Sequence, residues 1–131
     1  MPTRTDLQNL ALLRIKEAQT LLDNDLSEGA FYLAGYTIEL SLKSAICKNF
    51  EIDELFQDPE SANKTKEISE AFNKLKVHDL NTLIVFAGLY QKLKDKNEQI
   101  FESWSIIGQM KWNENCRYVP IGTNMEARCC Y

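Results

Sequence analysis

The chain has 131 residues, of which 44% are hydrophobic and 26% charged, with a formal net charge of −4. This composition is ordinary for a globular protein, and the length predicts one domain over residues 1–131. No apolar run reaches the roughly 18 residues of a membrane helix, and the N-terminus lacks the pattern of a signal peptide, so we expect a cytoplasmic protein with no membrane contact.

Charge is distributed unevenly along the chain. Residues 1–60 contain 5 basic and 11 acidic side chains, whereas residues 61–131 contain 10 basic and 8 acidic ones. The acidic half suits a basic partner. The lysines of the second half serve either solubility or nucleic-acid binding, and we favour solubility because lysines on exposed helix faces usually have that role.

The cysteines predict no metal site. Cys47, Cys116, Cys129 and Cys130 show no C-x-x-C spacing, and the single histidine cannot complete a zinc site. We therefore predict no metal and no cofactor. We expect the thiols to be reduced, with Cys47 as a small core residue.

The first predicted helix covers residues 6–22. Thr5 and Gln8 have the spacing of a capping box, and Asp6 places a negative charge in the first turn. Leu7, Leu10, Ala11, Ala18, Leu21 and Leu22 form its predicted core stripe. A long amphipathic helix therefore begins the chain.

The second predicted helix, residues 30–48, organises the rest of the chain. Asp25 and Glu28 are its predicted cap, and the short connection predicts an antiparallel hairpin with the first helix. Apolar residues lie on two sides, which places the helix at the centre of a bundle. Gly35 predicts a close approach by a neighbouring element. Glu39 and Lys43, four residues apart, predict a polar pair.

Weaker patterns follow. Apolar spacing predicts a helix over residues 64–76, a short helix over 80–87 that ends at Gly88, and a longer one over 89–107. Residues 110–123 form a predicted aromatic-rich loop, a type of segment that often carries function.

The chain ends soon after a further helix start. Thr123 and Glu126 form a predicted capping box, only a few residues before Tyr131. We therefore expect the final helix to be short or truncated.

Three segments, in order, resemble one branch of the HEPN (higher eukaryotes and prokaryotes nucleotide-binding) domains. They are Phe31-Tyr32-Leu33-Ala34-Gly35-Tyr36 with Ile38-Glu39 and Leu42-Lys43, then His78-Asp79-Leu80, and then Trp112 with Arg117-Tyr118. The resemblance implies an all-α, up-and-down bundle of about five helices. It also implies a homodimer, with a link to toxin–antitoxin or defence systems.

Catalytic HEPN domains resemble one another in an Arg-x4-6-His motif that serves as a metal-independent ribonuclease site. The matching arginine in this chain is Arg117, and its partner positions hold Gly122, Thr123 and Asn124. None of them is histidine. The sequence therefore argues against this activity in its usual form.

The catalytic candidates that remain are His78 and Arg117. A histidine has an unperturbed pKa of about 6.5, which suits general acid–base work. Alternatively, His78 and Asp79 cap the helix that begins at Leu80. His78, Arg117 and Glu39 make a polar site only if the fold brings them together.

The candidate ligand-binding residues are Glu39, Lys43, Trp112, Arg117 and Tyr118. An arginine beside aromatic rings can hold phosphate and stack a base. In the structural alternative, the aromatic rings seal the bundle and the charged residues pair internally.

We interpret the chain as a binding or interaction protein of toxin–antitoxin or defence type. Its predicted partners are a second copy, a nucleotidyltransferase-like protein, and RNA or a nucleotide. A metal-independent endoribonuclease using His78 and Arg117 is one alternative, and an inactive structural domain is the other.

Overall fold

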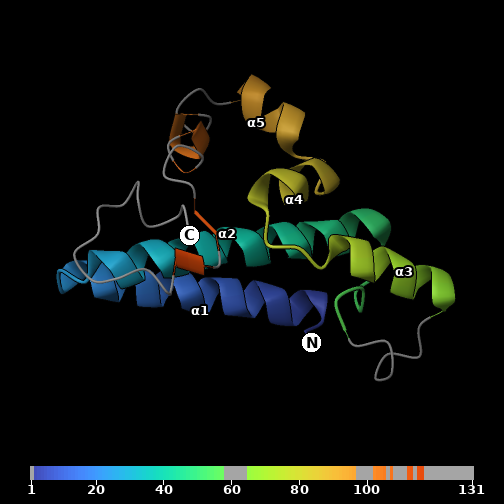
Figure 1. Cartoon of the computed structure of the whole chain (residues 1–131), viewed down its shortest axis with the longest axis horizontal. Coiled ribbons are helices and arrows are strands. Elements are labelled where there is room, and N and C mark those ends of the chain that lie inside the picture. The colour runs from blue at the N-terminus through green and yellow to red at the C-terminus, as the bar shows by residue number, and fades with distance from the viewer. Residues whose placement is uncertain are drawn as a thin grey trace.

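The computed structural model describes residues 2–57, 65–96, 102–105, 107, 112–113 and 115–116. Over these ranges the regular structure is helical and contains no strand, which confirms the all-α class (Figure 1). No helix in the described ranges has both the length and the apolar character needed to cross a membrane. The final helix predicted after Thr123 lies outside these ranges.

Helix α1, Arg4–Asp23, begins at a capping box formed by Thr3 and Asp6. The Asp6 carboxylate accepts from the backbone N–H of Thr3 at 2.9 Å, and the Thr3 hydroxyl accepts from the backbone N–H of Asp6. The predicted cap of Thr5 and Gln8 was therefore wrong. A carboxylate is a stronger acceptor than an amide oxygen, which favours the pair that contains Asp6.

Helix α2, Ser27–Phe50, follows after a short connection, and its N-cap is Leu26, which makes no side-chain capping bond. The predicted cap by Asp25 and Glu28 was wrong. Asp25 has a left-handed backbone with φ of 60°, so it forms the tight turn before the helix instead of the cap. The turn is held by a 2.8 Å bond from the Leu26 N–H to the Leu21 carbonyl.

The two long helices lie side by side along the long axis of the molecule, as Figure 1 shows. The core forms where α2 meets the start of α1 and the elements that follow α2. Its fully buried side chains include Leu7, Ile46, Cys47, Leu55, Phe56 and Leu83. The hairpin and the central position of α2 agree with the sequence prediction. The hairpin follows from the short connection, and the central position follows from a helix that is apolar on two sides.

The predicted core stripe of α1 is only partly buried. Leu7, Ala11 and Ala18 are buried, but Leu22 is 53% exposed. Including Leu22 was wrong, because α2 covers one side of α1 and the next turn of the stripe rotates away from it. Further exposed apolar side chains lie along α1, including Leu13 at 47% exposure.

Two shorter helices pack near the second half of α2. Helix α3, Lys66–Leu75, is capped by Thr65, and helix α4, Leu80–Phe86, is capped by Asp79. Gly88 follows α4 with φ of +70°, as expected for a helix stop. Helix α4 contacts α2 directly.

The long helix predicted over 89–107 is only partly described. Helix α5 covers Tyr90–Lys96, and residues 102–105 and 107 are also helical. The junction between these pieces lies outside the described ranges.

The cysteines differ from one another. Cys47 is fully buried, and burial raises the pKa of its thiol to about 11. Cys116 is disulfide-bonded, so the expectation that all thiols are reduced was wrong for this residue.

Candidate functional site

A buried carboxylate lies at the centre of the candidate site. Glu39 is in the middle of α2 and is 2% exposed. Its Oε1 atom lies 2.8 Å from Nζ of Lys43, one turn further along the helix, and 2.8 Å from Nδ1 of His78. We call Glu39, Lys43 and His78 the charged triad.

The fold brings the triad together from two distant parts of the sequence. Residues 39 and 78 are 39 positions apart. Asp79 caps α4 by accepting from the backbone N–H groups of Asn81 and Thr82. Because α4 packs on α2, the residue just before this cap is held above the carboxylate of Glu39. Capping by Asp79 is confirmed, whereas His78 itself contacts Glu39.

Lys43 supplies the positive charge that accompanies Glu39 into the interior. It is 8% exposed, and its ammonium also lies over the ring of Phe56, 5.6 Å from the ring centre. A buried charge is costly unless it is paired. The predicted polar pair is therefore an interior ion pair, and it holds the Glu39 carboxylate in place.

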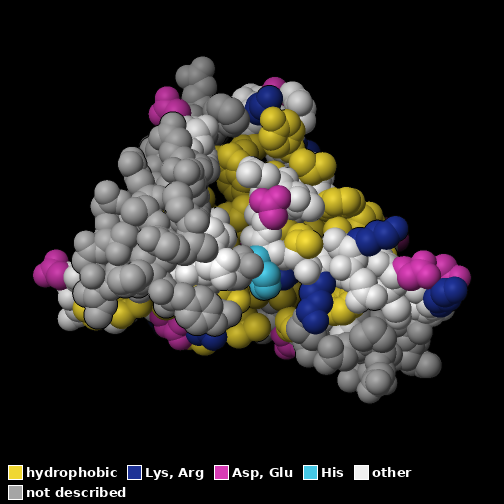
Figure 2. Space-filling view, viewed as in Figure 1, with side chains coloured by type: hydrophobic (Ala, Val, Ile, Leu, Met, Phe, Trp, Pro, Cys, Tyr) yellow, Lys and Arg dark blue, Asp and Glu magenta, His cyan; other side chains and the backbone are white. Residues whose placement is uncertain are grey.

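His78 is the member of the triad that faces outward. Its side chain is 40% exposed, and the imidazole is visible at the surface in Figure 2. An ionised carboxylate can only accept hydrogen bonds, so Nδ1 carries the hydrogen and donates it to Glu39. Nε2 has no partner among the described residues, and in the neutral ring its lone pair is available to a ligand.

The second carboxylate oxygen of Glu39 is buried and has no hydrogen-bond partner among the described residues. Buried acceptors without partners are rare, because each costs desolvation energy. A buried water that donates to this oxygen would satisfy it.

An aromatic cluster lies on the same side of α2, one turn before Glu39. Trp112 donates from Nε1 to the Tyr32 carbonyl at 3.1 Å, and its ring lies 6.4 Å from that of Tyr32 and 6.0 Å from that of Tyr36. Trp112 is 7% exposed. A Cβ added to Gly35 would come within 2.0 Å of its indole. The close approach predicted at Gly35 is therefore made by Trp112.

The predicted site residues thus fall into three groups. Glu39, Lys43 and His78 lie together, Trp112 is a buried packing residue near them, and Arg117 and Tyr118 lie outside the described ranges. Burial of Trp112 favours its structural alternative, because little of its ring remains for a ligand.

Sequence reasoning did not assign Tyr32 and Tyr36 to the site. They precede Glu39 by seven and three positions, the spacing of one helix face, and this signal was available.

The triad has the components of an acid–base or hydrogen-bonding site. A carboxylate that orients Nδ1 leaves Nε2 positioned toward a ligand, as in sites where a histidine accepts or donates protons. No group of three or more histidine, cysteine, aspartate or glutamate side chains in the described part of the chain is arranged to hold a metal ion.

No family model matches this chain, and neither a curated protein nor a solved structure matches it.

Proposed function

We propose that this chain is a HEPN-like helical binding protein, of toxin–antitoxin or defence type, that holds RNA or a nucleotide at the charged triad. The observation that carries the proposal is the 2.8 Å contact between the buried Glu39 carboxylate and the half-exposed imidazole of His78. Burying a carboxylate to orient one surface imidazole is a costly arrangement, and a ligand-binding role accounts for it.

The chemistry of the triad suits a phosphate or a base edge. Glu39 and Lys43 neutralise each other, so protonation of His78 gives the triad a net positive charge. A protonated imidazole donates a charge-assisted hydrogen bond to a phosphate oxygen, and the neutral ring accepts one from an amino group of a base. Tyr36, one helical turn before Glu39, is half-buried, so part of its side chain remains exposed.

A metal-independent endoribonuclease is the second candidate, and the same Glu39–His78 contact favours it. RNA cleavage needs a base to take the proton of the 2′-hydroxyl, and an oriented imidazole supplies one. The missing Arg-x4-6-His motif counts against this candidate. We therefore place binding first.

The partners in this proposal are a second copy of the chain and a nucleotidyltransferase-like protein. Exposed leucine side chains along α1, among them Leu13 and Leu22, support a protein contact on that helix. The acidic N-terminal half suits a partner with a basic surface.

The test is incubation of the purified protein with mixed single-stranded RNA, without added metal. Both RNA binding and RNA cleavage are then measured. The variants are His78→Ala, which removes the imidazole, and His78→Gln, whose amide occupies the place of Nε2. Arg117→Ala tests the arginine of the second candidate. Lys74→Ala is the control, because it removes an exposed charge from the neighbouring helix α3.

If the triad binds RNA, the wild type and Lys74→Ala should bind it equally. His78→Ala should lose RNA binding, and His78→Gln should keep part of it. Cleavage lost in His78→Ala, His78→Gln and Arg117→Ala would establish the enzyme instead. Neither binding nor cleavage by the wild type would contradict both candidates and leave the inactive structural domain.

A further inference from the structure

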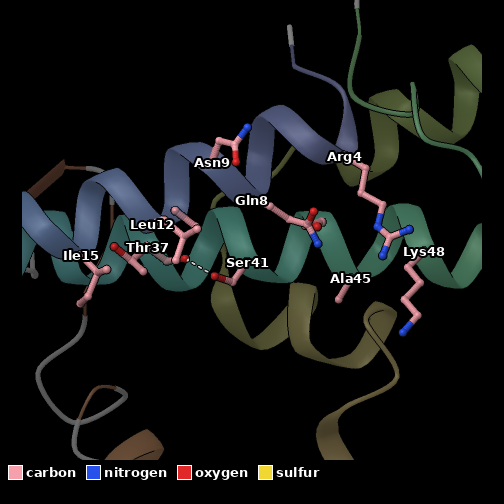
Figure 3. A pocket seen from close by; sticks show the side chains of 11 residues that line it. Arg4, Gln8, Asn9, Leu12, Ile15, Thr37, Ser41, Ala45 and Lys48 are labelled. Carbon is pink, nitrogen blue, oxygen red and sulfur yellow. Dashed lines mark hydrogen bonds between the residues drawn. The ribbon is translucent and has the colours of Figure 1, made fainter.

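A groove between α1 and α2 is separate from the charged triad. It has a volume of about 590 Å³ and runs along one side of the helix hairpin. Figure 3 shows its lining: Arg4, Gln8, Leu12 and Ile15 come from successive turns of α1, and residues of α2 face them. The volume is in the range of small-molecule sites, which hold about 300–1,000 Å³.

Two cations lie at one end of this groove. Arg4 begins α1 and Lys48 is in the last turn of α2, and Figure 3 shows both side chains at the same end. None of the described residues that line the groove is acidic. No carboxylate of the described residues lies within 4.0 Å of either cation, so their charges have no internal partner there.

The backbone of Arg4 is anchored at one end of the groove. Its backbone N–H donates to the Asp53 carbonyl at 2.9 Å, which fastens the start of α1 to the segment after α2. Its Nε atom is buried and has no hydrogen-bond acceptor among the described residues. The Arg4 side chain as a whole is half-buried, and a half-buried guanidinium without a counter-ion is unfavourable unless an anion in the groove pairs with its terminal nitrogens.

The lining changes along the groove. Ser44 and Gln8 lie next to the cationic end, and Ser41 follows one turn away. Leu12 and Ile15, which are 69% and 47% exposed, form the opposite end. The helical rise from residue 4 to residue 15 makes the groove roughly 16 Å long.

We propose that this groove binds a phosphate monoester with an apolar body. Arg4 and Lys48 together carry two positive charges, which match a phosphate dianion, and the arginine fork pairs with two phosphate oxygens at once. The Ser44 hydroxyl donates to a remaining phosphate oxygen, whereas the Ser41 hydroxyl already donates to the Thr37 carbonyl at 2.8 Å. The apolar body lies over Leu12 and Ile15 and covers side chains that water now contacts.

The proposal does not depend on the function proposed for the triad. The groove uses Ser41, Ser44 and Lys48 of α2, whereas the triad uses Glu39 and Lys43, which project from a different side of the same helix. Loss of one site therefore leaves the other intact.

The test is titration calorimetry of the full chain with three probes: n-hexyl phosphate, inorganic phosphate and n-hexanol. Arg4→Gln and Lys48→Gln each remove one cation of the groove. Lys16→Gln is the control, because Lys16 is an exposed cation of α1 outside this groove. Ser41→Phe places a ring in the groove without changing charge.

The proposal predicts that hexyl phosphate binds more tightly than inorganic phosphate and that hexanol does not bind measurably. Arg4→Gln and Lys48→Gln should each lower the affinity for hexyl phosphate at least about tenfold, as expected for a lost charged hydrogen bond. Ser41→Phe should abolish binding, and Lys16→Gln should leave it unchanged.

Three results would overturn the proposal. The first is the absence of hexyl phosphate binding to the wild type. The second is equal affinity for hexyl and inorganic phosphate, which would show that the apolar body contributes nothing to binding. The third is an equal loss of hexyl phosphate affinity in Lys16→Gln and Lys48→Gln, which would show that only the net charge of the protein matters.

Discussion

Glu39 is buried in the helix bundle. The stability of the fold therefore depends on the cation that neutralises the Glu39 carboxylate. Lys43 supplies the interior counter-charge and His78 supplies a second contact at the surface. Loss of the lysine would leave a buried carboxylate with only a half-exposed imidazole. The ion pair is therefore a requirement of the fold around the site, and in the proposed function His78 is the group that contacts the ligand.

We predict that Lys43→Met lowers the free energy of unfolding by about 3–5 kcal/mol, because it leaves the buried charge of Glu39 without its cation. The double variant Glu39→Leu, Lys43→Met should recover most of this loss, since it removes both charges. Urea unfolding at neutral pH measures both effects. Similar losses in the single and double variants would contradict the ion-pair account.

Gly35 is a second residue whose identity has a defined cause. We predict that Gly35→Ala destabilises the fold by about 1–3 kcal/mol through overpacking against Trp112, despite the better helix propensity of alanine. Gly29→Ala is the control, since its Cβ would meet only the end of the Leu21 side chain, at 3.1 Å. Thermal unfolding compares the two. Equal stability of both variants would show that Trp112 does not pack there.

At the scale of the element, local patterns located the helices better than their ends. The periodicity of apolar residues identified α1, α2, α3 and α4 within a few residues. The caps of α1 and α2 were misplaced, because several polar residues near each start compete and backbone geometry decides among them. Asp25, in its left-handed turn, is the clearest case.

The cap of α1 gives a pH-dependent prediction. Hydrogen bonds from Thr3 lower the pKa of Asp6 below 3.8, so the ionised carboxylate favours the folded state. Its stabilising contribution is present above about pH 4 and is lost as the pH falls through the lowered pKa. We predict that Asp6→Asn is less stable than the wild type at pH 7. Denaturant unfolding should show that the difference in free energy of unfolding between the wild type and Asp6→Asn becomes smaller below pH 3.8. A difference that does not change with pH would contradict the capping role.

At the scale of the whole molecule, the sequence identified the all-α class and the central helix, but not the contact between residues 39 and 78. Helical spacing reports which residues share a face of one helix. It carries no information on which segment, 39 residues away, packs over that face. Glu39, Lys43 and His78 were therefore named individually, while their assembly into one site became visible only in three dimensions.

The exposed leucines of α1 lead to a prediction about assembly. If they mediate the proposed homodimer, Leu13→Glu with Leu22→Glu should shift the mass in solution from dimer to monomer, because charge is disfavoured in an apolar interface. Gln19→Glu, an exposed change on the same helix, is the control. Light scattering coupled to size exclusion measures the mass. A wild-type monomer at all concentrations would contradict the dimer.

In the proposed function, His78 is the ligand-facing group of this protein and Glu39 orients it. The chain contains one histidine, so its imidazole gives a single set of ring signals in a nuclear magnetic resonance spectrum. The most direct measurement is to follow these signals while single-stranded RNA or a nucleotide is added. We expect a saturable shift of the ring signals that is abolished in Glu39→Gln. RNA or nucleotide binding that leaves the imidazole signals unchanged would contradict it.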